Sequence, residues 1–305
     1  MSILVTGGQG FLGKTLVSML RARGDDVVSY DRRMVEDTSD PKLHHVQGDL
    51  NDLPLLFETI RRHQVDRIIH TAAISHPVAS RDIPYQTVIT NALGTTTVFE
   101  AARLQNIRRV VNFSSECAYG SNEELGVIDE DAPLNPSTPY GATKVFGEKL
   151  AAVYNQLYGM EIISLRPGWI YGPGQFMQCY MKTLITNAIK GIKTVEEEGL
   201  DYRFQYVHVT DVANASILAA TVPMPYTYVF NITGGDQITY AELVSHVKAV
   251  FPAADIDIGP GSIAVLDRNA RFDLGRAKTH LGYVPQVTLD QGIRSYSDWL
   301  HQHDF

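Results

Sequence analysis

The chain opens with Ile3-Leu4-Val5-Thr6-Gly7-Gly8-Gln9-Gly10-Phe11-Leu12-Gly13, an apolar run followed by regularly spaced glycines. The apolar run predicts a buried strand. After the glycines, Leu12, Leu16 and Leu20 recur at the spacing of an amphipathic helix. Strand, glycine turn and helix in this order are typical of a dinucleotide site, where the helix N-terminus binds the pyrophosphate. A glycine triplet alone also fits a plain strand-to-helix turn.

The residues after the second predicted strand bear on which dinucleotide binds. This strand, 26–30, ends in Asp31, roughly 20 residues after the glycines. A carboxylate there can accept hydrogen bonds from the adenosine ribose and repels a 2′-phosphate, which favours NAD. Arg32 and Arg33 follow directly, and an arginine at this place can instead bind the phosphate of NADP. NADP therefore stays open as the less favoured cofactor.

Strands and helices alternate along the first two-thirds of the chain. We expect strands at 43–47, 67–71, 110–113 and 161–166, and helices at 54–63, 87–105 and 138–158. This alternation predicts an α/β fold with a Rossmann-type, doubly wound parallel sheet. Ligands bind such sheets at the carboxyl ends of the strands. Those ends are marked here by Gly7, Asp31, Asp49, Ala72 and Ser115.

The pattern becomes irregular after Pro173, which indicates a change in architecture. We expect residues 1–172 to form an NAD-binding Rossmann domain, to which segments near 205–235 return. Residues 173–305 are expected to form mainly a smaller C-terminal substrate-binding lobe.

Tyr140 and Lys144 are candidate catalytic residues, because four residues are about one helical turn and place both side chains on one face. A nearby ammonium stabilises a phenolate, so Lys144 is expected to lower the pKa of Tyr140 from about 10. Such a phenol can exchange a proton with a substrate hydroxyl, and the hydroxyl of Ser115 can hold that group in place. By itself, this spacing also fits a solvated helix face.

Composition excludes several other classes of protein. The formal charge of −8, with no basic stripe, argues against a nucleic-acid binder. No apolar run reaches the length of a membrane span, and no signal peptide precedes the first strand. Cys117 and Cys179 have neither metal-site nor disulfide spacing, which favours a reducing cytoplasm. The histidines lack a supporting ligand set, so we expect no metal.

Taken together, the motifs resemble the extended short-chain dehydrogenases/reductases, the NAD-dependent epimerase/dehydratase family. The resemblance spans nearly the whole chain. It is carried, beyond the glycine segment, by 48–50, 70–73, 91–95, 113–115 with 119–120, 140–144, 165–167 with 171–173, 206–213 and 273–285.

The resemblance implies a role for each matching residue. Tyr140 would be the acid/base, Lys144 would bind the nicotinamide ribose, and Ser115 would hold the reacting oxygen. Asp49 would contact the adenine. The implied cofactor-binding set is Gly7, Gly10, Phe11, Leu12, Gly13, Asp31, Arg32, Asp49, Leu50, Ala72, Ala73, Ile74, Asn91, Tyr140, Lys144 and Pro167.

The family also implies a homodimer, in which helices near 91–105 and 140–158 pack into a four-helix bundle. Their apolar faces fit an intramolecular core equally well.

The chain departs from the family pattern where substrate binds. Trp169 stands where members that use nucleotide-diphosphate sugars usually carry Asn, and Phe204 stands where they carry a diphosphate-binding Arg. Arg203, one residue away, and Arg271 are alternative anion ligands. Glu116-Cys117 replaces the Asp-Glu pair that is frequent in dehydratases, which argues against dehydration. The expected substrate-binding set is Ser115, Glu116, Trp169, Arg203 and Arg271.

Three functions follow from these patterns. The first is an NAD-dependent oxidoreductase that transfers hydride at a secondary hydroxyl of a sugar, sugar acid or polyol-like small molecule. The second is a nucleotide-sugar epimerase, similar to UDP-glucose 4-epimerase, that retains its NAD tightly. The third and least favoured is a dinucleotide-binding protein without catalysis.

Overall fold

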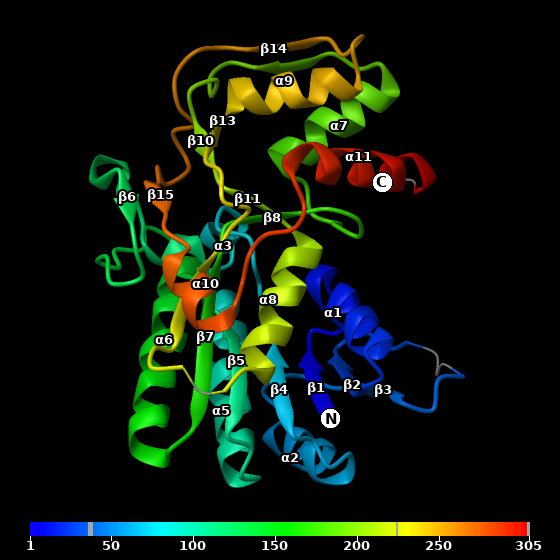
Figure 1. Cartoon of the computed structure of the whole chain (residues 1–305), viewed down its shortest axis with the longest axis vertical. Helices are drawn as coiled ribbons and strands as arrows, with labels where there is room; N and C mark the ends of the chain where they lie inside the picture. The colour runs from blue at the N-terminus through cyan, green and yellow to red at the C-terminus, as the bar shows by residue number, and fades with distance from the viewer. Residues whose placement is uncertain (36–38, 224, 304–305) are drawn as a thin grey trace.

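A central parallel sheet organises the protein, as shown by a computed structural model that describes residues 1–35, 39–223 and 225–303 (Figure 1). Seven strands lie in the order β12-β7-β5-β4-β1-β2-β3, and each pairs with its neighbours in parallel. Their bounds are β1 Ser2–Thr6, β2 Asp26–Asp31, β3 Leu43–Gln47, β4 Arg67–His70, β5 Arg109–Phe113, β7 Glu161–Pro167 and β12 Val229–Ile232. The predicted fold class is confirmed, with the chain switching direction across the sheet at β1.

Helices cover both faces of the sheet because successive side chains of a strand point to opposite sides. On one face, Ile3 and Val5 pack with α1 (Phe11–Ala22) and α8 (Val209–Thr221). On the other face, Leu4 packs with α2 (Leu53–Arg62) and α5 (Gly94–Leu104), and this core extends to α6 (Pro139–Tyr158). Both faces of β1 are therefore shielded from solvent, which explains its unbroken apolar sequence.

The helix expected at 87–105 is divided into three parts. It consists of α4 (Pro84–Val88), a π-helical turn at Ile89–Leu93 and α5, and the short α3 (Ala79–Asp82) precedes it. The wide turn contains the buried Asn91. A π-turn inside a helix leaves no periodicity signal in the sequence and is frequent at functional sites.

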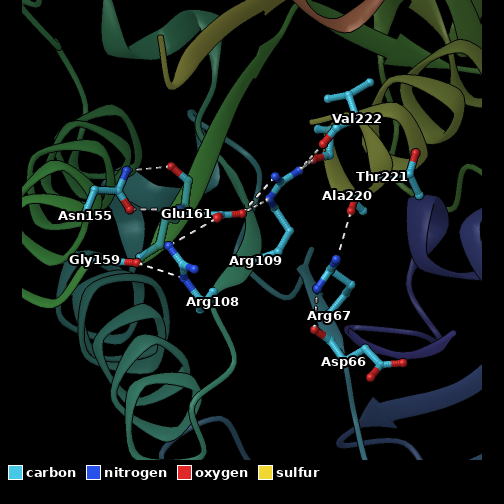
Figure 2. Close-up of polar contacts among 12 residues, drawn as sticks. Asp66, Arg67, Arg108, Arg109, Asn155, Gly159, Glu161, Ala220, Thr221 and Val222 are labelled. Atoms are coloured by element: carbon cyan, nitrogen blue, oxygen red, sulfur yellow. Dashed lines mark hydrogen bonds and ion pairs between the residues drawn. The ribbon is translucent and has the colours of Figure 1, made fainter. Parts of the chain in front are cut away.

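Two arginines at the amino end of the sheet hold the C-terminus of α8 (Figure 2). Arg109, at the start of β5, donates to the carbonyl oxygens of Ala219 and Val222 at 2.8 and 2.9 Å. Arg67, at the start of β4, donates to the Ala220 carbonyl at 3.2 Å. The last carbonyls of a helix lack intrahelical partners and carry its negative dipole end, so both cations stabilise α8 against the sheet.

Residues beyond β7 build most of a second lobe, which lies above the carboxyl edge of the sheet (Figure 1). Its helices are α7 (Tyr180–Lys190), α9 (Tyr240–Val250) and α11 (Leu289–Gln302), and α10 (Gly275–Leu281) packs near β12. Short strands connect them: β8 Trp169–Tyr171, β9 Thr194–Glu196, β10 Arg203–Phe204, β11 Tyr206–His208, β13 Ile238–Thr239, β14 Ile256–Ile258 and β15 Arg271–Phe272. The 3₁₀ turns Glu116–Ala118 and Glu123–Leu125, with β6 (Val127–Ile128), lie between β5 and α6.

The lobe is more regular than its sequence suggested. Capping boxes begin α9 at Thr239 with Glu242 and α11 at Thr288 with Gln291. The lobe core is rich in aromatic side chains, such as Tyr171, and these do not recur in the sequence at a regular helix or strand spacing. In the described part of the chain, no helix combines the length and apolar character that a bilayer span requires.

Candidate active site

A cavity of about 880 Å³ lies where the carboxyl ends of the sheet strands meet the lobe. Of the expected cofactor-binding residues, all except Asn91 line it. Of the expected substrate-binding residues, Ser115, Glu116 and Trp169 line it. The fold thus brings together residues from seven segments that are far apart in sequence.

The glycine turn forms the floor of this cavity. Gly7 has a φ of +70°, a left-handed conformation that favours glycine. At Gly13, an added Cβ would lie 2.0 Å from the Gly7 carbonyl oxygen, so only glycine allows helix and turn to approach this closely. No side chain caps the N-terminus of α1 at Gly10. Its first backbone N–H groups are therefore available to an anion in the cavity.

Asp31 stands at the end of β2, beside the glycine turn. Its carboxylate accepts hydrogen bonds from the backbone N–H groups of Gln9 and Arg33, both at 3.0 Å. These contacts fix the carboxylate at the cavity wall, where it is positioned to meet ribose hydroxyls. The cavity therefore fits the adenosine end of NAD.

Asn91, expected to bind the cofactor, is not among the residues that line the cavity. It is buried in the π-turn, where its side chain accepts from the Ile74 N–H at 2.8 Å and donates to the Ile74 carbonyl at 3.0 Å. It also donates to the hydroxyl of Thr143 on α6 at 3.1 Å. Asn91 is thus a positioning residue that ties the cavity-lining segment at Ile74 to the helix carrying Tyr140.

Tyr140 and Lys144 lie side by side in the first turns of α6. The helix begins at Thr138, whose hydroxyl accepts from the Gly141 N–H at 3.1 Å. The Lys144 ammonium lies 5.4 Å from the centre of the Tyr140 ring and donates to the Phe113 carbonyl at 2.8 Å. Since Phe113 ends β5, this bond fixes the lysine against the strand that leads to Ser115.

Burial dominates the acid–base properties of this pair. Desolvation raises the pKa of Tyr140, and its hydrogen bond with Ser115 counteracts that rise in part. Desolvation also lowers the pKa of Lys144 to about 8. The Lys144 ammonium is not among the causes of this shift, so the expectation that Lys144 lowers the pKa of Tyr140 stays a prediction.

The substrate end of the cavity is apolar and weakly acidic. Trp169 packs edge-on against Phe204, with ring centres 5.3 Å apart. Glu116 is 6 % exposed, and one of its carboxyl oxygens is buried without a hydrogen-bond partner. Burial raises the pKa of Glu116 well above its usual range and that of Cys117 to about 12. Burial therefore favours the neutral form of both groups.

Arg203 and Arg271, expected as substrate ligands, are not among the residues that line the cavity. Arg203 is exposed on β10, while its neighbour Phe204 is fully buried. Arg271 is exposed on β15, beside the buried Phe272. Successive side chains on a strand point to opposite sides, so each arginine faces away from the phenylalanine that packs inside.

Several lining residues escaped the sequence analysis. Arg33 was considered only as a phosphate ligand, whereas Phe176, Met177, Tyr180 and Glu196 were not considered at all. These lobe residues reach the cavity through tertiary folding, and no local spacing marks them. The nearest sequence signal for these lobe residues was Gly172, which stands between Tyr171 and Pro173.

Comparisons with known proteins agree with this site. The family model described as "NAD dependent epimerase/dehydratase family" matches residues 3–232. The chain belongs to this family. It is accordingly an NAD-dependent enzyme, and it shares the family's nucleotide-binding fold. Its cavity fits that cofactor, since the glycine turn, the uncapped α1 terminus and Asp31 all border it.

Relatives cover almost the entire chain. A dTDP-glucose 4,6-dehydratase of Streptomyces antibioticus is 30% identical, over 99% of this chain and 93% of its own length. A UDP-glucose 4-epimerase of Mycolicibacterium smegmatis is 32% identical, over 96% of each chain. The solved structure "MoeE5 in complex with UDP-glucuronic acid and NAD" superposes with a TM-score of 0.89 at 30% identity, covering 99% of both chains.

Proposed function

We propose that this enzyme transfers hydride between NAD and a secondary hydroxyl carbon of a sugar, sugar acid or polyol-like molecule, with Tyr140 as the acid/base. The observation that carries the proposal is the convergence of Ser115, Tyr140 and Lys144 in the cavity that begins at the glycine turn. NAD, when bound, supplies the hydride acceptor.

The residues have distinct tasks in this reaction. The Ser115 hydroxyl holds the substrate hydroxyl, and the Tyr140 oxygen exchanges a proton with it. The Lys144 ammonium remains near the Tyr140 ring and binds ribose hydroxyls of the cofactor. Burial keeps water away from the reacting carbon. Burial disfavours the Tyr140 phenolate, so the neutral phenol is ready to donate its proton in the reduction direction, whereas Tyr140 must first lose that proton to accept one from the substrate hydroxyl in oxidation.

Charge at the cavity wall favours a substrate without a diphosphate. Among described residues, the only Arg or Lys side chains in the lining are Arg32, Arg33 and Lys144. The two arginines follow β2 at the adenosine end, and Lys144 belongs to the catalytic group. Glu116 and Glu196 line the cavity instead of a bidentate arginine, which is the group that best binds a diphosphate.

The alternative is a nucleotide-sugar epimerase that keeps its NAD through a closed redox cycle. Its support comes from the relatives, one of which is a UDP-glucose 4-epimerase at 32% identity. Bound nucleotide in purified protein separates the two. Stoichiometric NAD after acid release favours the epimerase, whereas empty protein that reduces added NAD with a polyol or sugar acid favours the dehydrogenase.

Replacing Tyr140 with Phe tests the mechanism. The substitution removes the proton-transferring oxygen but keeps the ring, so we expect turnover to fall by at least about 10³-fold while NADH affinity stays within about threefold. Stopped-flow turnover and NADH fluorescence titration measure the two effects. Undiminished turnover would refute the role of Tyr140 as the acid/base.

We also propose that the protein is a homodimer through α4, α5 and α6. These neighbouring helices carry exposed apolar side chains, including Tyr85 at 78 %, Leu157 at 64 % and Leu104 at 44 % exposure. Large apolar side chains gathered on adjacent helices are typical of an interaction surface. The two cysteines are free thiols, in keeping with the cytoplasmic location that we propose.

A further inference from the structure

Residues 173–179, called the strap here, connect β8 to α7 along the cofactor cavity. Its members Gln175, Phe176, Met177, Gln178 and Cys179 all line the cavity. Gly172 and Gly174, at φ of +132° and +91°, set the turn by which the strap leaves β8. The strap therefore belongs to the lobe by sequence but faces the Rossmann domain.

The start of the strap is fixed to the lobe. Lys182 of α7 donates to the carbonyl oxygens of Gln175 and Phe176 at 2.8 and 3.2 Å. The Gln175 side chain, 4 % exposed, accepts from the Tyr296 hydroxyl at 3.0 Å and donates to the Ile170 carbonyl at 3.2 Å. These buried contacts hold Gln175 rigidly against α7 and α11.

The tip of the strap reaches the other side of the cavity. The Arg33 guanidinium carbon lies 5.4 Å from the centre of the Phe176 ring. The Ser75 hydroxyl lies 3.9 Å from the Met177 sulfur. Arg33 follows β2 and Ser75 follows β4, so these contacts lie on either side of β1.

The strap also passes above the glycine turn. A Cβ placed on Gly174 would lie 3.7 Å from the ring of Phe11, the first residue of α1. The space between the strap and the glycine turn is therefore where a dinucleotide diphosphate meets the N-terminus of α1.

We infer that the strap closes over the cofactor and that the contact between Arg33 and Phe176 sets the rate at which NAD leaves. This inference rests on the NAD-dependent function proposed above. Phe176 is 49 % exposed, so its ring contributes little to the packing of the fold and is free to cover the cofactor cavity. Opening requires the guanidinium to leave the ring, and an exposed cation–π contact slows such a step by about two- to fivefold.

The rate of strap opening has a direct consequence for the two candidate reactions. A dehydrogenase must exchange its cofactor in every cycle, so strap opening enters its turnover, whereas an epimerase gains from a strap that stays closed. Weakening the strap should therefore raise the release rate without changing the groups that perform the chemistry.

The test uses the full-length protein and NADH, followed by its fluorescence in a stopped-flow chase with excess NAD. We expect Phe176→Ala and Arg33→Ala each to release NADH about two- to fivefold faster than wild type. Because both remove one contact, the double variant should release NADH no faster than the faster single variant. Phe176→Leu should fall between, since it keeps apolar bulk but no ring.

Controls make the outcome decisive. Tyr226→Ala removes a fully exposed aromatic side chain that does not line the cavity, and its release rate should equal that of wild type. Unchanged release in both single variants, or effects that multiply in the double variant, would overturn the inference while leaving the proposed function intact. A wild-type protein that binds no NADH in the initial titration would refute the proposed function and the inference together.

Discussion

At the scale of single residues, desolvation decides the chemistry of the active site. Tyr140, Lys144 and Glu116 are all buried, and burial shifts the pKa of each in the direction that favours its neutral form. Sequence spacing shows which groups are neighbours but not how dry their surroundings are. The sign of the Tyr140 shift could therefore be established only once its burial was known.

Lys144 makes cofactor binding sensitive to pH. Its pKa is lowered to about 8, so the ammonium that binds the ribose is lost as pH rises through that value. We expect the NADH dissociation constant to be flat below pH 8 and to rise above it, by up to about tenfold per pH unit. Fluorescence titrations from pH 6.5 to 9.5 measure this. A Lys144→Met variant should bind more weakly than wild type below pH 8 and show no such rise, so the two curves approach each other above pH 8. A wild-type curve that stays flat to pH 9.5 would contradict the lowered pKa.

Glu116 should act as a neutral hydrogen-bond donor. One of its carboxyl oxygens is buried and has no hydrogen-bond partner among the described residues, the group lines the cavity, and burial favours its protonated form. Glu116→Gln also presents a neutral donor, so kcat/KM should stay within about fivefold, whereas Glu116→Ala should lower it about 10²-fold. Glu124→Gln, on an exposed turn, is the matched control. If the Gln variant is as impaired as the Ala variant, Glu116 transfers a proton instead.

At the scale of elements, the paired arginines below the sheet give a sharp test of helix anchoring. Arg108 and Arg109 both contact Glu161, at 3.4 and 2.9 Å, but their side chains are 69 % and 4 % exposed (Figure 2). Arg109→Met removes the donor to the carbonyls of Ala219 and Val222 at the end of α8, so we expect a loss of about 2–3 kcal/mol in the free energy of unfolding. Arg108→Met should cost at most about 0.5 kcal/mol. Urea unfolding followed by circular dichroism compares them; equal losses would show that α8 does not depend on Arg109.

Elements with strong local signals were predictable from the sequence. The buried strands and the glycine turn carry apolar runs and spacings that need no tertiary knowledge. The π-turn around Asn91 was missed, because one extra residue per turn leaves the apolar pattern of the helix nearly intact. The direction of Arg203 could not be predicted either, since which side of a two-residue strand faces the core depends on its pairing with β13.

At the scale of the whole molecule, the exposed apolar side chains of α4 to α6 predict self-association. Leu157→Arg places a charge on this surface, and we expect it to shift the protein from dimer to monomer in sedimentation velocity. Val195→Arg is the control, because Val195 is equally exposed, at 63 % against 64 %, but lies on β9 in the lobe. A wild-type protein that sediments as a monomer would refute the proposed dimer.

The position of β12 affects how the chain folds during its synthesis. β12 pairs with β7, yet β7 ends at residue 167 and β12 begins at residue 229. During synthesis, part of the lobe therefore leaves the ribosome before β12 does. Until β12 has been made, the edge of β7 that pairs with it stays unpaired. A fragment that ends at residue 172 would keep that open edge permanently. Expressed alone, this fragment should aggregate through contacts between unpaired strand edges. The sheet therefore needs the later part of the chain to complete its folding.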